Sequence, residues 1–191
     1  MTTQIPDAEP ALIAAAQSGD VDAHARLYTL FAPLVYTLAC RMLVSRALAE
    51  DVLQETFLEV LGKIGTYRGD AGLGFWVRRI AVNKCLMYLR SSWVARQSDE
   101  EPPELGASDD GAQRLEEQSA LEAALAELTP AARAVVWLHD VEGYTHREIA
   151  ASMGKTPSFS KSQLARAHER LRELLAGYSA EDGVELCAPA R

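Results

Sequence analysis

Residues 97–111, which read QSDEEPPELGASDDG, constrain the fold more than any other part of the chain. The segment has two adjacent prolines, two glycines and almost no large apolar side chain, so it cannot contribute to a packed core. Longer stretches with helical patterning lie on both sides of it. We therefore predict two small helical domains, at about 9–93 and 120–176, joined by a flexible acidic linker over 94–119. The tail, residues 177–191, is expected to be loose.

The composition favours an all-α fold, because alanine and leucine are abundant and runs of β-branched residues are short. The net charge of −8 argues against nucleic-acid binding only when the chain is taken as a whole. Residues 94–119 contain eight acidic and two basic residues, which makes −6. The block 9–93 has nine basic and eight acidic residues, and 120–176 has seven of each. Both helical blocks can therefore carry local basic surfaces.

Several classes of function lack support in the sequence. No run of about 18 apolar residues is present, so we expect no membrane-spanning helix. Residues 1–9 lack the basic and apolar blocks of a signal peptide, which predicts a cytoplasmic protein with reduced thiols. The cysteines are Cys40, Cys85 and Cys187, and the histidines are His24, His139, His146 and His168. Neither set has metal-ligand or catalytic-triad spacing, so we predict no metal, no cofactor and no enzymatic activity.

Helical periodicity and breakers divide the first block into four helices. We expect a long second helix with a kink or break at Pro33, and a glycine-rich loop over 65–74. The predicted helices span 10–17, 23–44, 47–62 and 75–93.

The second block has clearer helix boundaries. Thr129 and Pro130 supply an N-cap and a first-turn proline for a helix that continues through Val141. Thr145 and Glu148 have the spacing of a capping box, and the helix that they begin is expected to end at Gly154. A turn then leads into a long helix that reaches about residue 176.

The last two helices of this block have the pattern of a helix-turn-helix. Ala150 is small enough for the helices to cross closely, and Gly154 tolerates the positive φ of the turn. The outer face of the final helix can reach phosphates and base edges in a major groove, unless it is an ordinary solvated face. Its polar residues are Lys161, Ser162, Gln163, Arg166 and Arg170.

An acidic ridge lies in the first block. Asp51, Glu55 and Glu59 recur every four residues, opposite an apolar stripe. Such a ridge can bind a basic protein surface, and the alternative from spacing alone is a solubilising helix face.

Aromatic and basic residues are mixed over residues 67–90. This mixture suits stacking on unpaired bases while their phosphates are held, although Trp76 could equally be a core residue. The candidate residues are Tyr67, Arg68, Trp76, Arg79, Asn83, Lys84 and Arg90.

These motifs together resemble the extracytoplasmic-function (group IV) subfamily of bacterial sigma-70 factors. The resemblance covers residues 10–176 and rests on DVLQETF, FWVRRIAVN, the acidic linker, LTPAARAVVWLHDVEGYTHREIAASMG and RAHERLREL, in that order. It implies that the first domain binds core RNA polymerase and melts the −10 element, and that the second reads the −35 element of promoter DNA. It also implies an anti-sigma factor as a partner. The implied polymerase contacts are Asp51, Gln54, Glu55 and Glu59.

The sequence departs from the family pattern at several positions. SFSKSQL stands where the family commonly has GTVKSRL, so that Ser160 replaces an apolar residue and Gln163 an arginine. Met87 stands where aspartate is common, and Gly72 and Gly74 make the preceding loop unusually glycine-rich. Promoter sequence therefore does not transfer from the family to this chain.

Two alternatives remain open at the level of sequence. A stand-alone helix-turn-helix regulator would bind duplex operators without polymerase, usually as a dimer. A helical adaptor would bind only protein.

Overall fold

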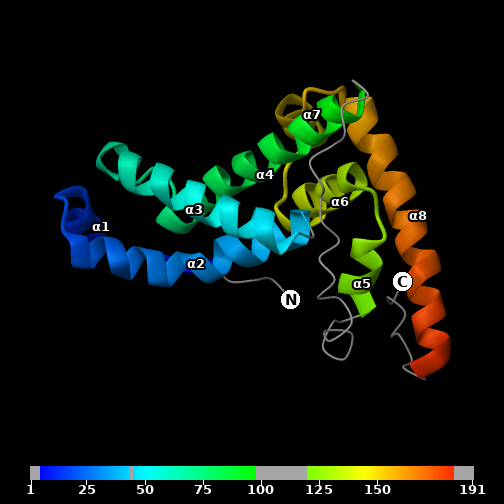
Figure 1. Cartoon of the computed structure of the whole chain (residues 1–191), viewed down its shortest axis with the longest axis horizontal. Coiled ribbons are helices and arrows are strands. Elements are labelled where there is room, and N and C mark those ends of the chain that lie inside the picture. The colour runs from blue at the N-terminus through cyan, green and yellow to red at the C-terminus, as the bar shows by residue number, and fades with distance from the viewer. Residues whose placement is uncertain (1–4, 44, 98–119, 183–191) are drawn as a thin grey trace. The chain divides into compact units, whose positions relative to one another are not determined.

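The computed structural model describes residues 5–43, 45–97 and 120–182, and these are helical with no strand among them. They form two separate units, one on each side of the gap at 98–119 (Figure 1). The predicted all-α class with two helical domains is confirmed. Most of the acidic linker lies outside the described residues, and its first residues, 94–97, are helical.

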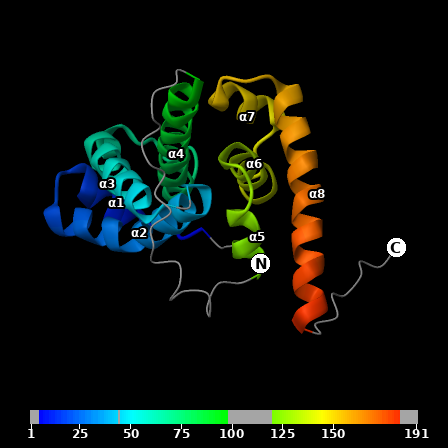
Figure 2. The same ribbon diagram turned by 45° about the vertical axis from the view of Figure 1, so that its right-hand side comes forward.

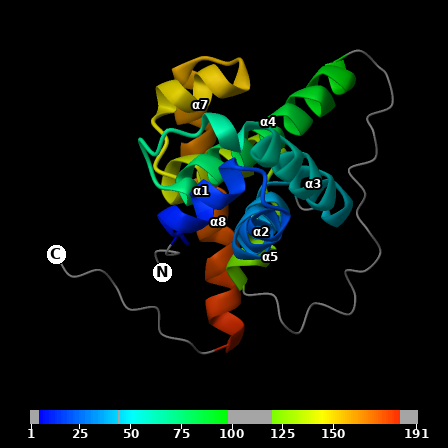
Figure 3. The same ribbon diagram turned by 90° about the vertical axis from the view of Figure 1, so that its left-hand side faces the viewer.

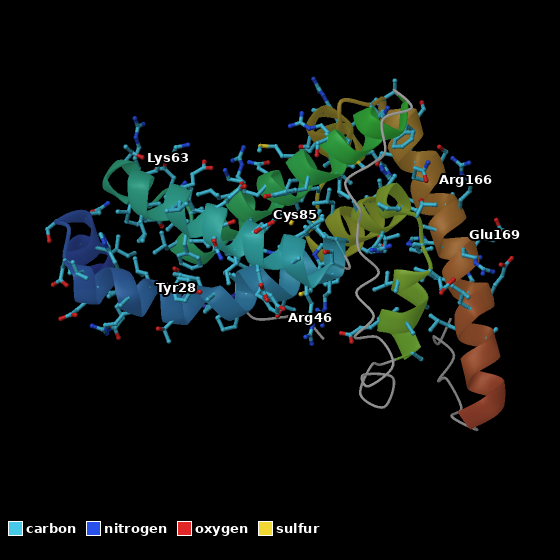
Figure 4. The ribbon with its side chains drawn as sticks, viewed as in Figure 1. Tyr28, Arg46, Lys63, Cys85, Arg166 and Glu169 are labelled. Carbon is cyan, nitrogen blue, oxygen red and sulfur yellow. The ribbon has the colours of Figure 1, made fainter. Side chains whose placement is uncertain are left out.

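The first unit is built on three long helices that pack against one another: α2 (Val21–Leu43), α3 (Arg46–Lys63) and α4 (Leu73–Gln97). The short helix α1 (Pro10–Gln17) contacts α2 and the 3-10 turn η1 (Ile64–Thr66) (Figure 3). Leu27, Phe31, Val52, Leu86 and Leu89 fill the core between the long helices. On α4, Val82 and Cys85 are buried beside these leucines, and Figure 4 labels Cys85.

Pro33 does not break α2, which runs without interruption from Val21 to Leu43. A proline in a helix interior removes one backbone hydrogen bond and costs about 3 kcal/mol. Phe31 and Val35, on either side of it, are fully buried, while Pro33 itself is exposed. Burial of two such side chains contributes about 1.5–3 kcal/mol each, which offsets the cost and keeps the helix continuous.

The second unit consists of helices that pack along the length of α8 (Pro157–Asp182) (Figure 2). These are α5 (Ala120–Ala126), α6 (Pro130–Val136) and α7 (His146–Met153), with a π-helical turn, η3 (Trp137–Val141), after α6. The tail was expected to be loose from residue 177, which is wrong for 177–182, because these residues extend α8.

The helix ends of the second unit follow the sequence signals. The Thr129 side chain accepts from the backbone N–H of Ala132, and Thr145 with Glu148 forms the expected capping box. Gly154 ends α7 with φ of 65°, in the left-handed region that favours glycine. These caps place α7 and α8 as the two helices of a helix-turn-helix.

Candidate functional site

The outer face of α8 is polar and open to solvent. Lys161, Ser162, Arg166 and Arg170 are exposed, and Figure 4 shows Arg166 projecting from the helix. Gln163 is half-buried, beside the core positions Leu164 and Ala167. The spacing of Gln163, Arg166 and Arg170 puts these three on one flank of the helix.

Hydrogen bonds restrain part of this face. The Ser162 hydroxyl donates to the carbonyl of Phe159 at 3.0 Å, so it is satisfied within its own helix. Arg166 donates from Nε to the Ser162 carbonyl at 3.2 Å, and Arg170 pairs with Glu173 at 3.1 Å. Lys161 has no such restraint among the described contacts. The two arginines are therefore held in preferred orientations, and the lysine is a freer positive charge.

Ser160, a departure from the family pattern, is fully buried in the first turn of α8. Its hydroxyl lies 3.0 Å from Nδ1 of His146, the first residue of α7. A buried hydroxyl needs such a partner, because an unsatisfied one costs about 1–3 kcal/mol. The serine and the histidine thus replace an apolar contact with a hydrogen bond between the two helices of the motif.

His146 belongs to a polar cluster that the sequence analysis missed. Its ring stacks on that of His139 with centroids 4.5 Å apart, and His139 and His168 bind the two carboxylate oxygens of Asp140 at 2.8 and 2.6 Å. Burial works to raise the pKa of Asp140, but the hydrogen bonds from both histidines outweigh it and hold that pKa below its ordinary value. Burial, followed by the charges of His139 and Lys161, lowers the pKa of His146. No short sequence motif contains all three of the histidines at positions 139, 146 and 168, so only the fold brings them together.

The acidic ridge on α3 is only partly free. Asp51 and Gln54 are exposed, as expected. Glu55 accepts from the Tyr88 hydroxyl at 2.8 Å, and Lys84 lies 3.5 Å from Glu55. The expectation that the whole ridge faces solvent is therefore wrong for Glu55, which is half-buried against α4.

Glu59 is also engaged within the unit. It pairs with Lys63 at 2.8 Å and with Lys84 at 3.1 Å. Hydrogen bonds from Lys63 and then Lys84 lower the pKa of Glu59, and the bond to Glu59 is the main cause that raises the pKa of Lys84. Burial and the bond to Glu55 raise the pKa of Tyr88 to about 12. Lys84, which the sequence analysis placed among DNA contacts, is thus a link between α3 and α4.

Leu58 is an exposed apolar residue on the same helix and was missed. Its side chain is 75% exposed, and it lies four residues after Gln54 and seven after Asp51, on one face. A single exposed leucine is common on protein surfaces, so only the face that it shares with Asp51 and Gln54 connects it with a protein contact. The sequence signal was its position outside the apolar stripe of α3.

Tyr67 and Trp76 form an aromatic pair where the 67–72 loop meets α4. Their ring centroids are 5.4 Å apart with the planes tilted by 47°, and the Tyr67 hydroxyl donates to the carbonyl of Ala71. Both rings are half-buried, whereas Phe75, which the sequence analysis did not select, is 59% exposed. The start of α4 therefore presents three aromatic side chains beside the exposed Arg68.

One face of α4 continues this surface. Arg79, Asn83 and Arg90 are all exposed, and their spacing puts them on one face of the helix. Met87 lies between the last two and is also exposed, so the family's usual aspartate is replaced here by a neutral, apolar side chain. The face can hold a phosphate backbone while the aromatic residues contact bases.

Within the described ranges, no group of three or more histidine, cysteine, aspartate or glutamate side chains has the arrangement of a metal site. None of the helices in those ranges is long and apolar enough to cross a membrane.

Both units match known protein families. Residues 27–94 match the family described as Sigma-70 region 2, and residues 118–171 match Sigma-70, region 4.

Similar proteins span most of the chain. The chain is 36% identical to "RNA polymerase sigma factor CarQ" of Myxococcus xanthus over 163 residues, which cover 83% of this chain and 92% of that protein. It is 35% identical to "ECF RNA polymerase sigma factor SigM" of Mycobacterium tuberculosis strain H37Rv over 174 residues, covering 90% and 85%. Among solved structures, the sigma factor RpoE of Bartonella quintana, in complex with the anti-sigma factor NepR, superposes with a TM-score of 0.52. That match has 23% identity, covers 82% of this chain and 98% of the other, and is a likeness of fold.

Proposed function

The chain belongs to the extracytoplasmic-function class of the sigma-70 family, and on this premise we propose how its two units divide the work of transcription initiation. As a sigma factor it directs promoter-specific transcription by RNA polymerase. We assign sigma domain two to residues 9–93, the acidic linker to 94–119 and sigma domain four to 120–176. The family is one of initiation factors, and we propose a cytoplasmic protein without enzymatic activity.

One observation carries the assignment of two DNA contacts to one chain. Each unit exposes basic and polar side chains along its longest solvent-facing helix, α4 in the first unit and α8 in the second. A stand-alone regulator needs only the helix-turn-helix, and a protein adaptor needs neither basic face. Two such faces fit two promoter elements bound together.

We place the polymerase contact on the exposed part of the α3 face. Asp51 and Gln54 supply the polar contacts, and Leu58 adds apolar area beside them. Glu55 and Glu59 contribute mainly by fixing α3 on α4, since their carboxylates already bind Tyr88, Lys63 and Lys84; this is a change from the full acidic ridge. An anti-sigma factor is expected to cover the same polar and apolar face.

The −10 contact is assigned to the start and outer face of α4. We propose that Tyr67, Phe75 and Trp76 stack on unpaired bases. Arg68 lies on the exposed loop beside them. Stacking of one base on an aromatic ring is worth about 1–3 kcal/mol. The residues proposed to hold the adjoining strand are Arg79, Asn83 and Arg90.

The −35 contact is assigned to α8. Gln163 and Arg166 are proposed to read base edges, with Lys161 and Arg170 on phosphates and Ser162 close to the backbone. The partial burial of Gln163 favours a contact at the edge of the interface, and the restrained guanidinium of Arg166 favours a bidentate contact with guanine.

Run-off transcription with purified core RNA polymerase tests the proposal. The expected result is a specific transcript that depends on this protein and disappears when either the −10 or the −35 element is scrambled. Operator binding that needs no polymerase would support the regulator instead. Binding to polymerase without promoter-specific transcription would support the adaptor.

A further inference from the structure

The N-terminal segment lies against the loop that precedes α4, although more than 45 residues separate them in sequence. Asp7 accepts a hydrogen bond from the backbone N–H of Leu73, the first residue of α4, at 2.9 Å. Gln17, the last residue of α1, donates from Nε2 to the carbonyls of Ile64 and Tyr67 at 3.1 and 3.0 Å. Both ends of the 67–72 loop are therefore held by residues from the start of the chain.

The glycines that depart from the family pattern make room for this contact. A side-chain carbon at position 72 would lie 2.7 Å from a carboxylate oxygen of Asp7. One at position 74 would overlap the Pro6 carbonyl oxygen and lie 2.6 Å from Cγ2 of Ile5. Real side-chain carbons do not approach other atoms so closely. At position 74 the obstacle is the Pro6 backbone, so the packing of residues 5 and 6 requires Gly74, whereas a side chain at position 72 would displace the Asp7 carboxylate.

Each of the two polar contacts lies close in sequence to one member of the aromatic pair. Gln17 binds the backbone of Tyr67 itself, and Leu73 precedes Trp76 by less than one helical turn. Burial and then the nearby charge of Asp7 raise the pKa of the Tyr67 hydroxyl, which agrees with a close approach of the N-terminal carboxylate. The N–H of Leu73 has no partner inside α4, because the first N–H groups of a helix are left over. Asp7 therefore acts as a cap from a distant part of the chain.

We propose that residues 5–17 form a brace that holds Tyr67 and Trp76 in the geometry for capturing an unpaired promoter base, with Asp7 and Gln17 as positioning residues for promoter opening. This inference rests on the proposed function, because it assumes that the aromatic pair meets melted DNA. Preorganisation is the physical reason: a loop held at both ends loses less conformational entropy when it binds.

The test measures the rate at which the holoenzyme opens a promoter that it transcribes. A fluorescent base analogue in the −10 element reports the opening. Asp7→Ala removes the acceptor, Asp7→Asn keeps an oxygen that can accept from Leu73, and Glu9→Ala is the control for an exposed carboxylate nearby. We expect Asp7→Ala to slow opening about fivefold, the effect of one hydrogen bond, and the other two variants to open at the parent rate. On a pre-melted template the Asp7→Ala defect should disappear.

Gly74→Ala perturbs the brace in a different way. Alanine strengthens a helix by up to about 1 kcal/mol relative to glycine, so weaker helicity cannot explain a defect. We expect slower opening because the new methyl group displaces residues 5 and 6. If the brace acts through the aromatic pair, Asp7→Ala combined with Trp76→Ala should be no slower than Trp76→Ala alone, since the two changes are not additive.

Three outcomes would overturn the brace while leaving the sigma function intact. The first is parent-rate opening by Asp7→Ala. The second is equal slowing on duplex and pre-melted templates with weakened polymerase binding, which indicates a general folding defect. The third is faster opening, which means that residues 5–7 cover the site.

If the parent protein opened no promoter with core polymerase, the proposed function itself would fail. In that case hydrogen exchange of the free chain tests the brace by itself. Faster exchange of residues 67–73 in Asp7→Ala, but not in Asp7→Asn, would support the brace, and unchanged exchange would reject it.

Discussion

Arg133 provides the sharpest test of how the second unit is held together. Its side chain is only 4% exposed. The guanidinium donates to the carbonyls of Leu125 at 2.9 Å, Ala126 at 3.3 Å and Leu128 at 2.7 Å, at and just beyond the C-terminal end of α5. Burial lowers the pKa of Arg133 to about 10, so the group stays charged at neutral pH. A single buried cation thus caps the end of one helix from the next.

Arg133→Met removes the donors and keeps an unbranched chain of similar reach. Ala126 is exposed, so water can replace the third bond, while the bonds to Leu125 and Leu128 are buried. Two hydrogen bonds to a charged group are worth about 1.5–3 kcal/mol each. Methionine avoids the cost of burying a cation, which favours the lower end of that range. We expect the second unit to lose about 3 kcal/mol of unfolding free energy, and Arg133→Lys to lose part of that.

Urea unfolding of the full chain measures this loss. Two background substitutions, Trp76→Phe and Trp93→Phe, make Trp137 the only tryptophan of the chain. Because Trp137 is buried in the second unit, its fluorescence follows the unfolding of that unit alone. Arg147→Met is the matched control, because Arg147 is exposed on α7 and its loss should change stability by less than about 0.5 kcal/mol. Equal urea midpoints for the parent and Arg133→Met would show that the guanidinium does not hold α5.

Three further predictions concern the proposed surfaces and the first unit. Asp51→Lys should weaken core polymerase binding on the order of tenfold or more in a fluorescence titration without lowering the thermal midpoint, and unchanged affinity would reject the contact. Arg166→Ala should cost about 1–3 kcal/mol of binding free energy only at promoters with a preferred −35 base, whereas Lys161→Ala should weaken binding to all promoters alike and reduce the slope of log K against log salt concentration by about one. If both variants weakened all promoters equally, α8 would not read bases. The lowered pKa of Glu59 means that its ion pairs stabilise the first unit above pH 4.5, the ordinary pKa value, and are lost as the pH falls through the lower folded pKa. Glu59→Gln should therefore flatten the decline of the urea midpoint at acid pH, and an unchanged decline would contradict the pairing of Glu59 with Lys63 and Lys84.

The sequence determined the helical architecture because its signals are local. Thr129 caps a residue three positions away, Thr145 and Glu148 cap each other, and Gly154 takes up the positive φ of its own turn. Such interactions form within one helical turn and need no information from the rest of the chain. The proline-rich acidic segment at 97–111 separated the two blocks, and the order of the motifs indicated the family.

Only the tertiary structure decided which polar groups were free to act. Periodicity placed Glu55 on the polar side of α3, but the packing of α4 brought Lys84 and Tyr88 to it from about 30 residues away. In the same way, the fold joined Asp7 to Leu73 across 66 residues and His168 to Asp140 across 28. A helical pattern gives the direction of a side chain around its own axis, and it carries no information on which neighbour lies in that direction. The partners are set by how the helices pack, where burial of apolar area outweighs any one polar contact.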